Sequence, residues 1–292
     1  MSERNNQIFT QGDSEQQASA QAVRDAGVQG RTRDIMRDDF GFEIPVESVP
    51  LPSQGKVYPQ GHPLHGLSVL DITAMTAREE DILTSRALIK KGTVISELIK
   101  SCLVDKRIQP EDMLAGDRNA LMVSIRVTGY GREYQAEIVC ESCNERSESS
   151  FDLAALPIKT LGINPVDLGQ NLFEFKLPKT SAVVRFAFLT GNDEEQLVAE
   201  HDRKRKKLKL KSESLVTSRL ERSIVSVNGI EDRNKIMMFV RRMPAADSRA
   251  LRNFMEEHEP GIEMKAWTQC ESCGEDQLAS MPIGAKFFWP DA

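Results

Sequence analysis

Four of the five cysteines form two copies of one tetrapeptide. The first copy is Cys140-Glu141-Ser142-Cys143 and the second is Cys270-Glu271-Ser272-Cys273. A Cys-x-x-Cys turn presents two thiolates at the separation that a tetrahedral metal ion needs, and two such turns complete a site of the structural zinc type. Soft thiolate ligands in this geometry select zinc. The sequence therefore predicts one structural zinc ion, with the ligands Cys140, Cys143, Cys270 and Cys273.

Two other uses of the cysteine pairs stay open at this point, a redox-active dithiol and a disulfide. A redox Cys-x-x-Cys usually opens a helix, whose dipole lowers the pKa of the thiol. These pairs instead end predicted strands, and the residues that follow them, Asn144 and Gly274, tolerate the left-handed turn of a metal knuckle. A reducing intracellular compartment also favours metal over a disulfide. A closed four-cysteine site would leave no open position for catalysis.

The cysteine pairs end two segments that resemble each other. A shift of 130 residues, which places Cys140 on Cys270, also places Asp117 on Asp247 and Gly131 on Gly261. Beyond the cysteines, residues 153–158 resemble residues 278–283. Duplicated units are the simplest explanation. We therefore predict two pseudo-symmetric repeats, residues 67–171 and 172–292, related by a two-fold axis near the metal.

The elements that must position the cysteines are helices and short strands, so the predicted fold class is α+β. It consists of two pseudo-symmetric repeats of helices and small antiparallel sheets, joined by a zinc-ribbon-like four-cysteine site. In the first repeat, Thr76 and Glu79 form a capping box that opens a helix. The expected strands are 67–72, 134–139, 149–153, 173–177, 183–188 and 262–268, and the expected helices are 76–88, 93–103, 117–129, 215–227, 232–242, 247–257 and one from about 193.

Two segments precede the repeats. Residues 1–38 are polar without sustained periodicity, which predicts a disordered tail. Residues 39–66 are rich in proline and glycine, which predicts an extended arm lying on a surface. At the other end, Phe287-Phe288-Trp289 is apolar and needs cover from the other repeat or from a neighbouring subunit.

Composition bounds the function. The 292 residues are 40% hydrophobic, which is enough for an ordinary core. The formal net charge of −6 argues against a protein that coats nucleic acid. The absence of a signal-like segment and of an apolar run long enough for a bilayer predicts a soluble intracellular protein.

Other residues that could do chemistry have simpler interpretations. The four histidines, His62, His65, His201 and His258, are expected to pack or to bond to backbone rather than to hold metal. Cys102 is expected in the core, and Asp117, Asp232 and Asp247 are expected to cap helices. No nucleophile elbow, phosphate-binding glycine loop or His/Glu metal motif is present, so no enzyme is predicted.

Three further stretches resemble a known family. Leu51-Pro52-Ser53-Gln54-Gly55-Lys56-Val57-Tyr58-Pro59, the residues 75–83 and Gly116-Asp117-Arg118-Asn119 are similar to the T4-type baseplate proteins of contractile-tailed phages, which are hub or hub-assembly components. The resemblance covers most of the chain after about residue 45. It implies a non-enzymatic role in building the tail baseplate, in several copies, through contacts with other phage baseplate or hub proteins and without a small-molecule substrate or a membrane span. The protein would act in the host cytoplasm during assembly, or stay in the virion tail baseplate.

An alternative of another class is a zinc-ribbon protein that binds nucleic acid through the knuckles and the basic residues 203–211. The negative net charge and the 6% aromatic content count against it. The same basic run is also typical of a solvated helix face. A thiol redox enzyme is a third alternative.

Overall fold

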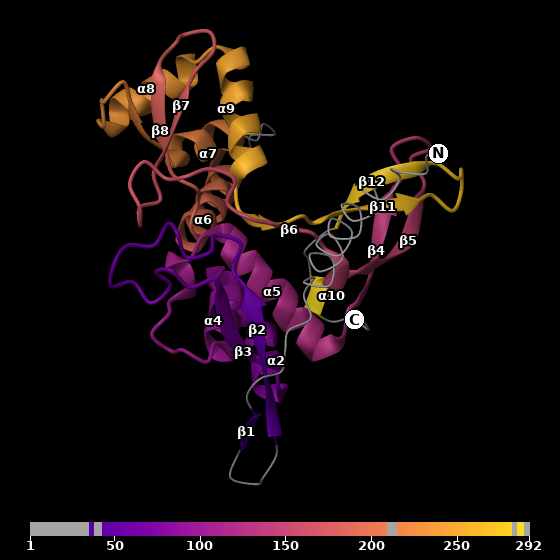
Figure 1. Ribbon diagram of the computed structural model, residues 1–292. Helices are drawn as coiled ribbons and strands as arrows, with labels where there is room; N and C mark the ends of the chain where they lie inside the picture. Colours follow the sequence, from indigo (N-terminus) through magenta and orange to yellow (C-terminus); the bar gives the residue numbers. More distant parts are fainter. Residues whose placement is uncertain (1–34, 38–42, 209–214, 282–284, 289–292) are drawn as a thin grey trace, which may run out of the picture.

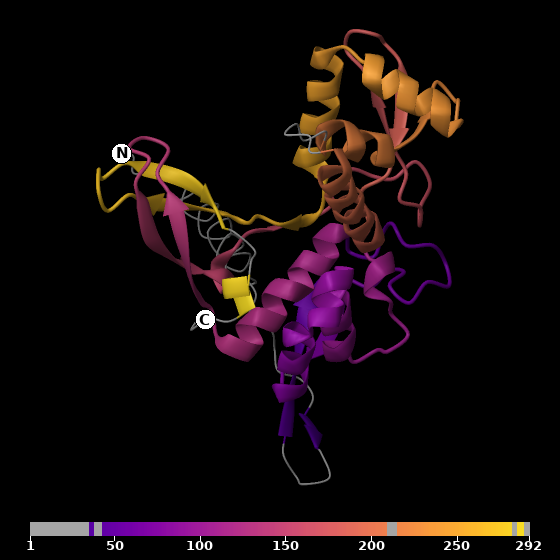
Figure 2. The same ribbon diagram turned by 180° about the vertical axis from the view of Figure 1, so that it is seen from behind.

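Helices and small antiparallel sheets build the computed structural model, which describes residues 35–37, 43–208, 215–281 and 285–288. The predicted α+β class is confirmed. The helices and two of the sheets form two lobes, and two β-hairpins lie together to one side of them (Figures 1 and 2). The predicted disordered tail lies outside the described residues, apart from β1 (Ile35–Arg37).

The first lobe begins with β2 (Glu43–Pro50), which pairs antiparallel with β1 and with β3 (Val69–Thr73). Thr76 then opens α2 through the predicted capping box. The predicted helix 76–88 is divided in two, because the backbone turns extended at Ser85. The Thr84 hydroxyl donates to the carbonyls of Glu80 and Asp81, a bond that competes with helix propagation. The helices of this lobe are α2 (Ala77–Thr84), α3 (Arg86–Lys91), α4 (Val94–Cys102), η1 (Pro110–Asp112) and α5 (Ala115–Tyr130).

The second lobe has a sheet of three antiparallel strands, β7 (Phe173–Lys176), β8 (Val183–Phe186) and β9 (Ile224–Val227). The predicted helix 215–227 is wrong at its end, because β-branched Ile224, Val225 and Val227 join the sheet beside β8. The basic run begins in α6, and its residues 209–211 lie outside the described part. The helices here are α6 (Gly191–Leu208), α7 (Leu215–Ser223), α8 (Arg233–Arg242) and α9 (Ala245–His258).

Three further pairs of strands lie outside the two lobe sheets. Two of the pairs are the hairpins, and the third connects the lobes. One hairpin is β4 (Glu133–Val139) with β5 (Arg146–Asp152), and the other is β11 (Lys265–Gln269) with β12 (Asp276–Ser280). After the 3₁₀ turn η2 (Leu153–Ala155), the short β6 (Ile158–Lys159) pairs with β10 (Gly261–Ile262). The predicted strand 262–268 is thus two strands with different partners.

The proline- and glycine-rich arm belongs to the core of the first lobe. Residues 43–50 are strand β2, and residues 51–66 form successive turns. The extended arm is therefore wrong for residues 51–66, because apolar side chains fold the segment back onto its own chain. Those side chains, Leu51, Val57, Tyr58 and Leu64, are all buried.

The C-terminal phenylalanines are covered by the chain itself. Phe287 and Phe288 in α10 (Ala285–Phe288) are buried, and α10 contacts α5. The buried Arg126 of α5 donates from Nε to the carbonyl of Phe287 over 2.5 Å and from its other nitrogens to the carbonyls of Gly131 and Glu133. Cover thus comes from the first lobe, as one of the two predicted sources. Trp289 lies outside the described residues.

Two aspartates lie buried in the first turns of α5 and α9. Asp117 accepts hydrogen bonds from the N–H and hydroxyl of Ser53 and from the Tyr58 hydroxyl, at 2.6 to 2.9 Å. Asp247 accepts from the N–H groups of Lys179 and Thr180 and from the Thr180 hydroxyl. The predicted capping role is correct for Asp232, which begins α8, and wrong for these two, whose carboxylates anchor distant turns.

Candidate metal centre

The two Cys-x-x-Cys turns have the same backbone geometry. In the first, the Cys140 N–H donates to the carbonyl of Glu145 over 2.9 Å, and the Asn144 N–H donates to the carbonyl of Cys140 over 2.9 Å. In the second, Cys270 and Gly274 make the equivalent bonds over 2.9 and 2.8 Å. Asn144 and Gly274 are left-handed, with φ of 60° and 74°. Each turn is therefore a knuckle of the kind the sequence predicted.

The structure brings all four predicted cysteines together. Their Sγ atoms all lie within 4.8 Å of one another. The Sγ atoms of Cys140 and Cys273 are 3.7 Å apart, as are those of Cys143 and Cys270. Zinc–sulfur bonds of about 2.3 Å in a tetrahedron require sulfurs about 3.8 Å apart, whereas a disulfide needs about 2.05 Å. The four thiols are therefore close enough to share one metal ion, and they are too far apart for a disulfide.

Small side chains let the hairpins pack against each other beside this cluster. Ala136, Ser149 and Ala279 are buried, and the Thr268 hydroxyl donates to the Ser149 hydroxyl over 2.9 Å. At the tip, the Glu141 N–H donates to the side-chain carbonyl of Gln277 over 3.0 Å. These contacts fix one knuckle relative to the other.

The thiols differ in environment. Cys140 and Cys270 are buried, while Cys143 and Cys273 are exposed at the tip. The N–H groups of Cys273 and Ser272 point at the Cys270 sulfur and lower its pKa to about 7. The N–H of Glu275 acts in the same way on Cys273. Partial desolvation of its sulfur inside the cluster and the three neighbouring thiols nevertheless raise the pKa of that thiol to about 12. A thiophilic cation that displaces the protons would find four convergent sulfur ligands.

The remaining candidates of the sequence lie elsewhere. His65 and His258 bond through Nδ1 to the carbonyls of Tyr58 and Phe254, and His62 stacks on the Tyr58 ring. Cys102 is fully buried in the core, as predicted, and burial raises its pKa to about 12. Among the described residues, the cysteine cluster is the single group of three or more His, Cys, Asp or Glu side chains that lie close enough to hold a metal.

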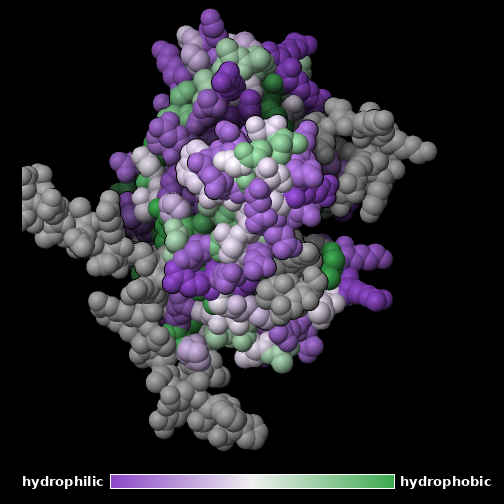
Figure 3. Space-filling model, turned by 90° about the vertical axis from the view of Figure 1, so that its right-hand side faces the viewer, coloured by the Kyte–Doolittle hydropathy of each residue, from purple (hydrophilic) through white to green (hydrophobic). Residues whose placement is uncertain are grey.

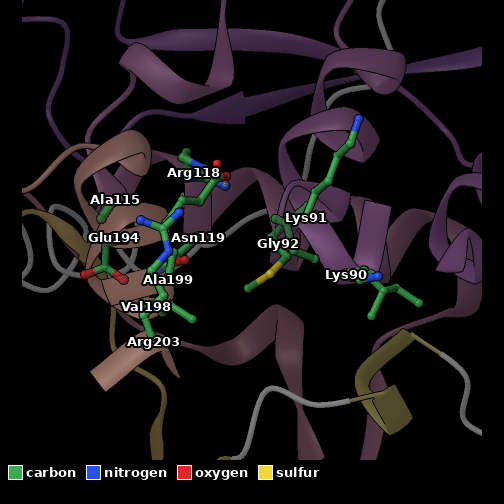
Figure 4. Close-up of a pocket in the computed structure, with 14 residues that line it drawn as sticks. Lys90, Lys91, Gly92, Ala115, Arg118, Asn119, Glu194, Val198, Ala199 and Arg203 are labelled. Atoms are coloured by element: carbon green, nitrogen blue, oxygen red, sulfur yellow. Dashed lines mark hydrogen bonds and ion pairs between the residues drawn. The ribbon is translucent and has the colours of Figure 1, made fainter. Parts of the chain in front are cut away.

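A cavity of about 600 Å³ that the sequence did not indicate lies between α3, α4 and α5 of one lobe and α6 of the other. Figure 4 shows Lys90 and Lys91 on one side and Glu194, Val198 and Arg203 on the other. Arg118 on its floor donates to Glu195 and to the Ser96 hydroxyl, both over 3.0 Å. No motif could have revealed this cavity, because its walls come from segments far apart in the chain.

Fold and cluster together define a two-lobed α+β protein whose hairpins gather four thiols, and no described helix is long and apolar enough to span a bilayer. The family model of the T4 bacteriophage base plate protein matches residues 45–289. The chain belongs to this family. No curated protein and no solved structure matches it. The resemblance noted from the sequence is therefore confirmed.

Proposed function

We propose that this protein is a structural or assembly component of the hub region of a phage contractile-tail baseplate. The observation that carries the proposal is the family match over residues 45–289, which covers most of the chain. The protein acts without catalysis, through contacts with other baseplate or hub proteins, and is present in several copies. It acts in the host cytoplasm during assembly, or stays in the virion tail baseplate.

We further propose that Cys140, Cys143, Cys270 and Cys273 hold one structural zinc ion. The 3.7 Å sulfur separations and the matched knuckles support this assignment. Zinc bound to four thiolates has no open position, so it stabilises the fold and leaves no site for a substrate. Zinc is the default thiophilic ion for such a site.

The two lobes with their hairpins are, in this proposal, two copies of one ancestral unit, a zinc-ribbon-like pair around the metal. The sequence predicted the first copy as residues 67–171 and the second as residues 172–292, and the proposal extends the first copy back to β2. The equivalent placement of Asp117 and Asp247 supports the duplication, since each anchors the turn that follows a Leu-Pro pair, Leu51-Pro52 or Leu177-Pro178. Thr76 with Glu79 and Thr190 with Asp193 repeat the same helix-opening bonds.

Complementation of a phage that lacks the gene tests the function. The parent protein should restore contractile tails in electron micrographs. The double variant C140S/C143S should restore few, because metal binding is coupled to folding and the fold without its metal is less stable. Normal tails without any protein would contradict the baseplate role. Normal tails with C140S/C143S would contradict a required metal.

A further inference from the structure

A tryptophan and a leucine lie exposed side by side on the second hairpin. Trp267 of β11 is 73% exposed and Leu278 of β12 is 50% exposed, and the two residues are directly opposite in the strand register. Directly opposite side chains on one face of a hairpin touch. They form an apolar patch on the outer face, away from the small residues that pack on the first hairpin. Figure 3, which looks onto the hairpin side of the molecule, shows a mainly hydrophilic surface in which hydrophobic areas are small.

The first hairpin shows that the fold does not need this patch. Trp267 lies three residues before its knuckle and Leu278 five residues after it, and the residues at these places in the first hairpin are Glu137 and Glu148. They too are directly opposite in the register. Two carboxylates therefore occupy, on one hairpin, the pair of positions that carries an indole and an isobutyl group on the other. An exposed tryptophan that the hairpin does not require marks a contact surface.

The charge around the patch decides which partner fits it. Asp276, two residues before Leu278 on the same face of β12, is exposed, and so are Glu271 and Glu275 at the cysteine turn that ends this hairpin. Lys265, the basic residue of the outer face, lies 3.7 Å from Glu256 and 4.0 Å from Glu263. The rim is thus acidic, which repels nucleic acid, anionic membranes and the same patch of a second copy.

We propose that Trp267 and Leu278 dock on a different protein of the same tail, one that offers an apolar hollow rimmed by lysine or arginine. The patch rests on geometry alone, and the naming of a tail protein as its partner rests on the proposed baseplate function. The two hairpins then have divided roles. Both contribute to the four-cysteine cluster, and the second alone provides the contact.

Replacing the two patch residues by their counterparts from the first hairpin tests the patch separately from the fold. The double variant W267E/L278E gives the second hairpin the pair that the first already carries, so it should fold and bind the same amount of zinc. Its melting temperature should fall by only a few degrees, because the two opposed carboxylates lack the arginine that pairs with Glu137 on the first hairpin. Loss of a tryptophan-centred contact should weaken docking by at least about 30-fold. The matched control, E137Q/E148Q, changes the equivalent pair on the first hairpin. We expect W267E/L278E to reduce contractile tails at least tenfold in complementation, and the control to match the parent.

Photocrosslinking identifies the partner in infected cells. p-Benzoylphenylalanine placed at position 267 should crosslink to a peptide of another phage protein with more lysine and arginine than acidic residues, and the same probe at position 137 should not. Crosslinks to nucleic acid, to a second copy or to an acidic peptide would overturn the proposal, as would equal crosslinking from both positions or full complementation by W267E/L278E. A phage that makes normal tails without the gene would reject the proposed function, and a basic phage peptide crosslinked at 267 would still support the patch.

Discussion

Asp117 and Asp247 both lie in the first turn of a helix, yet the pKa of Asp117 is raised and the pKa of Asp247 is lowered. Burial raises the pKa of Asp117 against three hydrogen bonds from Ser53 and Tyr58. Burial acts in the same direction on Asp247, but the N–H groups of Lys179 and Thr180 and the Thr180 hydroxyl outweigh it and lower the pKa. The charge of Lys179 also lowers the pKa of Asp247, whereas the three hydrogen bonds of Asp117 do not offset the desolvation of its carboxylate.

The lowered pKa of Asp247 predicts a pH-dependent contribution to stability. The ionised carboxylate stabilises the fold above the unfolded value of 3.8, and this contribution is lost as pH falls through the lower folded pKa. D247N should therefore melt below the parent at pH 7, and the difference should shrink below about pH 4. The control D232N replaces one good helix cap by another and should melt like the parent. A difference between D247N and the parent that stays constant from pH 7 to pH 3 would contradict this account.

Single cysteine substitutions should separate the metal ligands from the core cysteine. We expect C270S to lose zinc and several kcal/mol of unfolding free energy, since metal binding is coupled to folding. That loss lowers the melting temperature on the order of 10 °C or more. C102A should melt lower through a core cavity and keep its zinc, as measured by metal analysis and thermal unfolding together. Zinc retained by C270S at the parent level would remove Cys270 from the ligand set.

At the residue scale, the sequence predicted those side-chain positions that a local motif specifies. The gathering of the four cysteines followed from two knuckles and a repeat, while the metal itself stays a prediction. The roles of Asp117 and Asp247 could not be predicted, because their partners lie far away in the chain. Ser53 is 64 residues and Tyr58 is 59 residues before Asp117.

At the scale of elements, α10 depends on one buried guanidinium. Arg126 is fully buried, and its hydrogen-bond partners given by the structure are three carbonyls, with the Tyr130 ring 5.5 Å away. Desolvation lowers the pKa of this guanidinium, but the group stays charged because the pKa of an arginine lies far above neutral pH to begin with. The charge therefore serves to bind the end of the chain and the start of β4 to α5.

R126A should release α10. The substitution leaves three carbonyls without this donor, at a cost of about 1–3 kcal/mol each where they stay dry. We expect faster hydrogen exchange and proteolysis at residues 285–288 and a lower melting temperature. R132A, which removes an exposed arginine paired with Asp152, should leave both unchanged. Unchanged protection of α10 in R126A would show that Phe287 and Phe288 hold the helix by themselves.

The turns of residues 51–66 should prove indispensable for folding. Replacing them with a glycine–serine linker removes Leu51, Val57, Tyr58 and Leu64 from the core and leaves the Asp117 carboxylate without its partners. We expect no cooperative thermal transition. A folded, zinc-binding product would restore the arm as a separate docking element. The prolines and glycines correctly excluded a helix in residues 51–66, but they did not indicate which part of the protein covers this segment.

At the scale of the whole molecule, the lobes interlock at several points. β6 of the first lobe pairs with β10 of the second, and Leu114 bridges to Thr190. The backbones approach so closely that a Cβ added to Gly116 would lie 1.7 Å from the carbonyl oxygen of Pro260. The pattern of the sequence predicted most of the helices and strands of each lobe, but not β2 and β9. It did not predict these contacts, which arise from the fit of the two surfaces.

Neither lobe should fold alone. Residues 43–171 and 172–292, expressed separately, each lose half of the cysteines and one strand of the β6–β10 pair, so neither should unfold cooperatively. Co-expression with zinc should restore a single complex with one melting transition. Sharp, independent transitions of the separate halves would mean two autonomous domains.

The contact between Cys143 and Cys270 spans 127 residues of chain. A metal there would close a loop around the whole second lobe, and such a loop restricts the unfolded chain far more than the folded one. The conformational entropy removed from the unfolded ensemble amounts to on the order of 4–5 kcal/mol in the polymer description of crosslinks. Much of the stabilisation by zinc would then come from the unfolded chain and not from contacts in the folded protein. A protein stripped of its ion could keep its shape and still unfold more readily, and once unfolded it would have to bring distant thiols together again before the lobes could close.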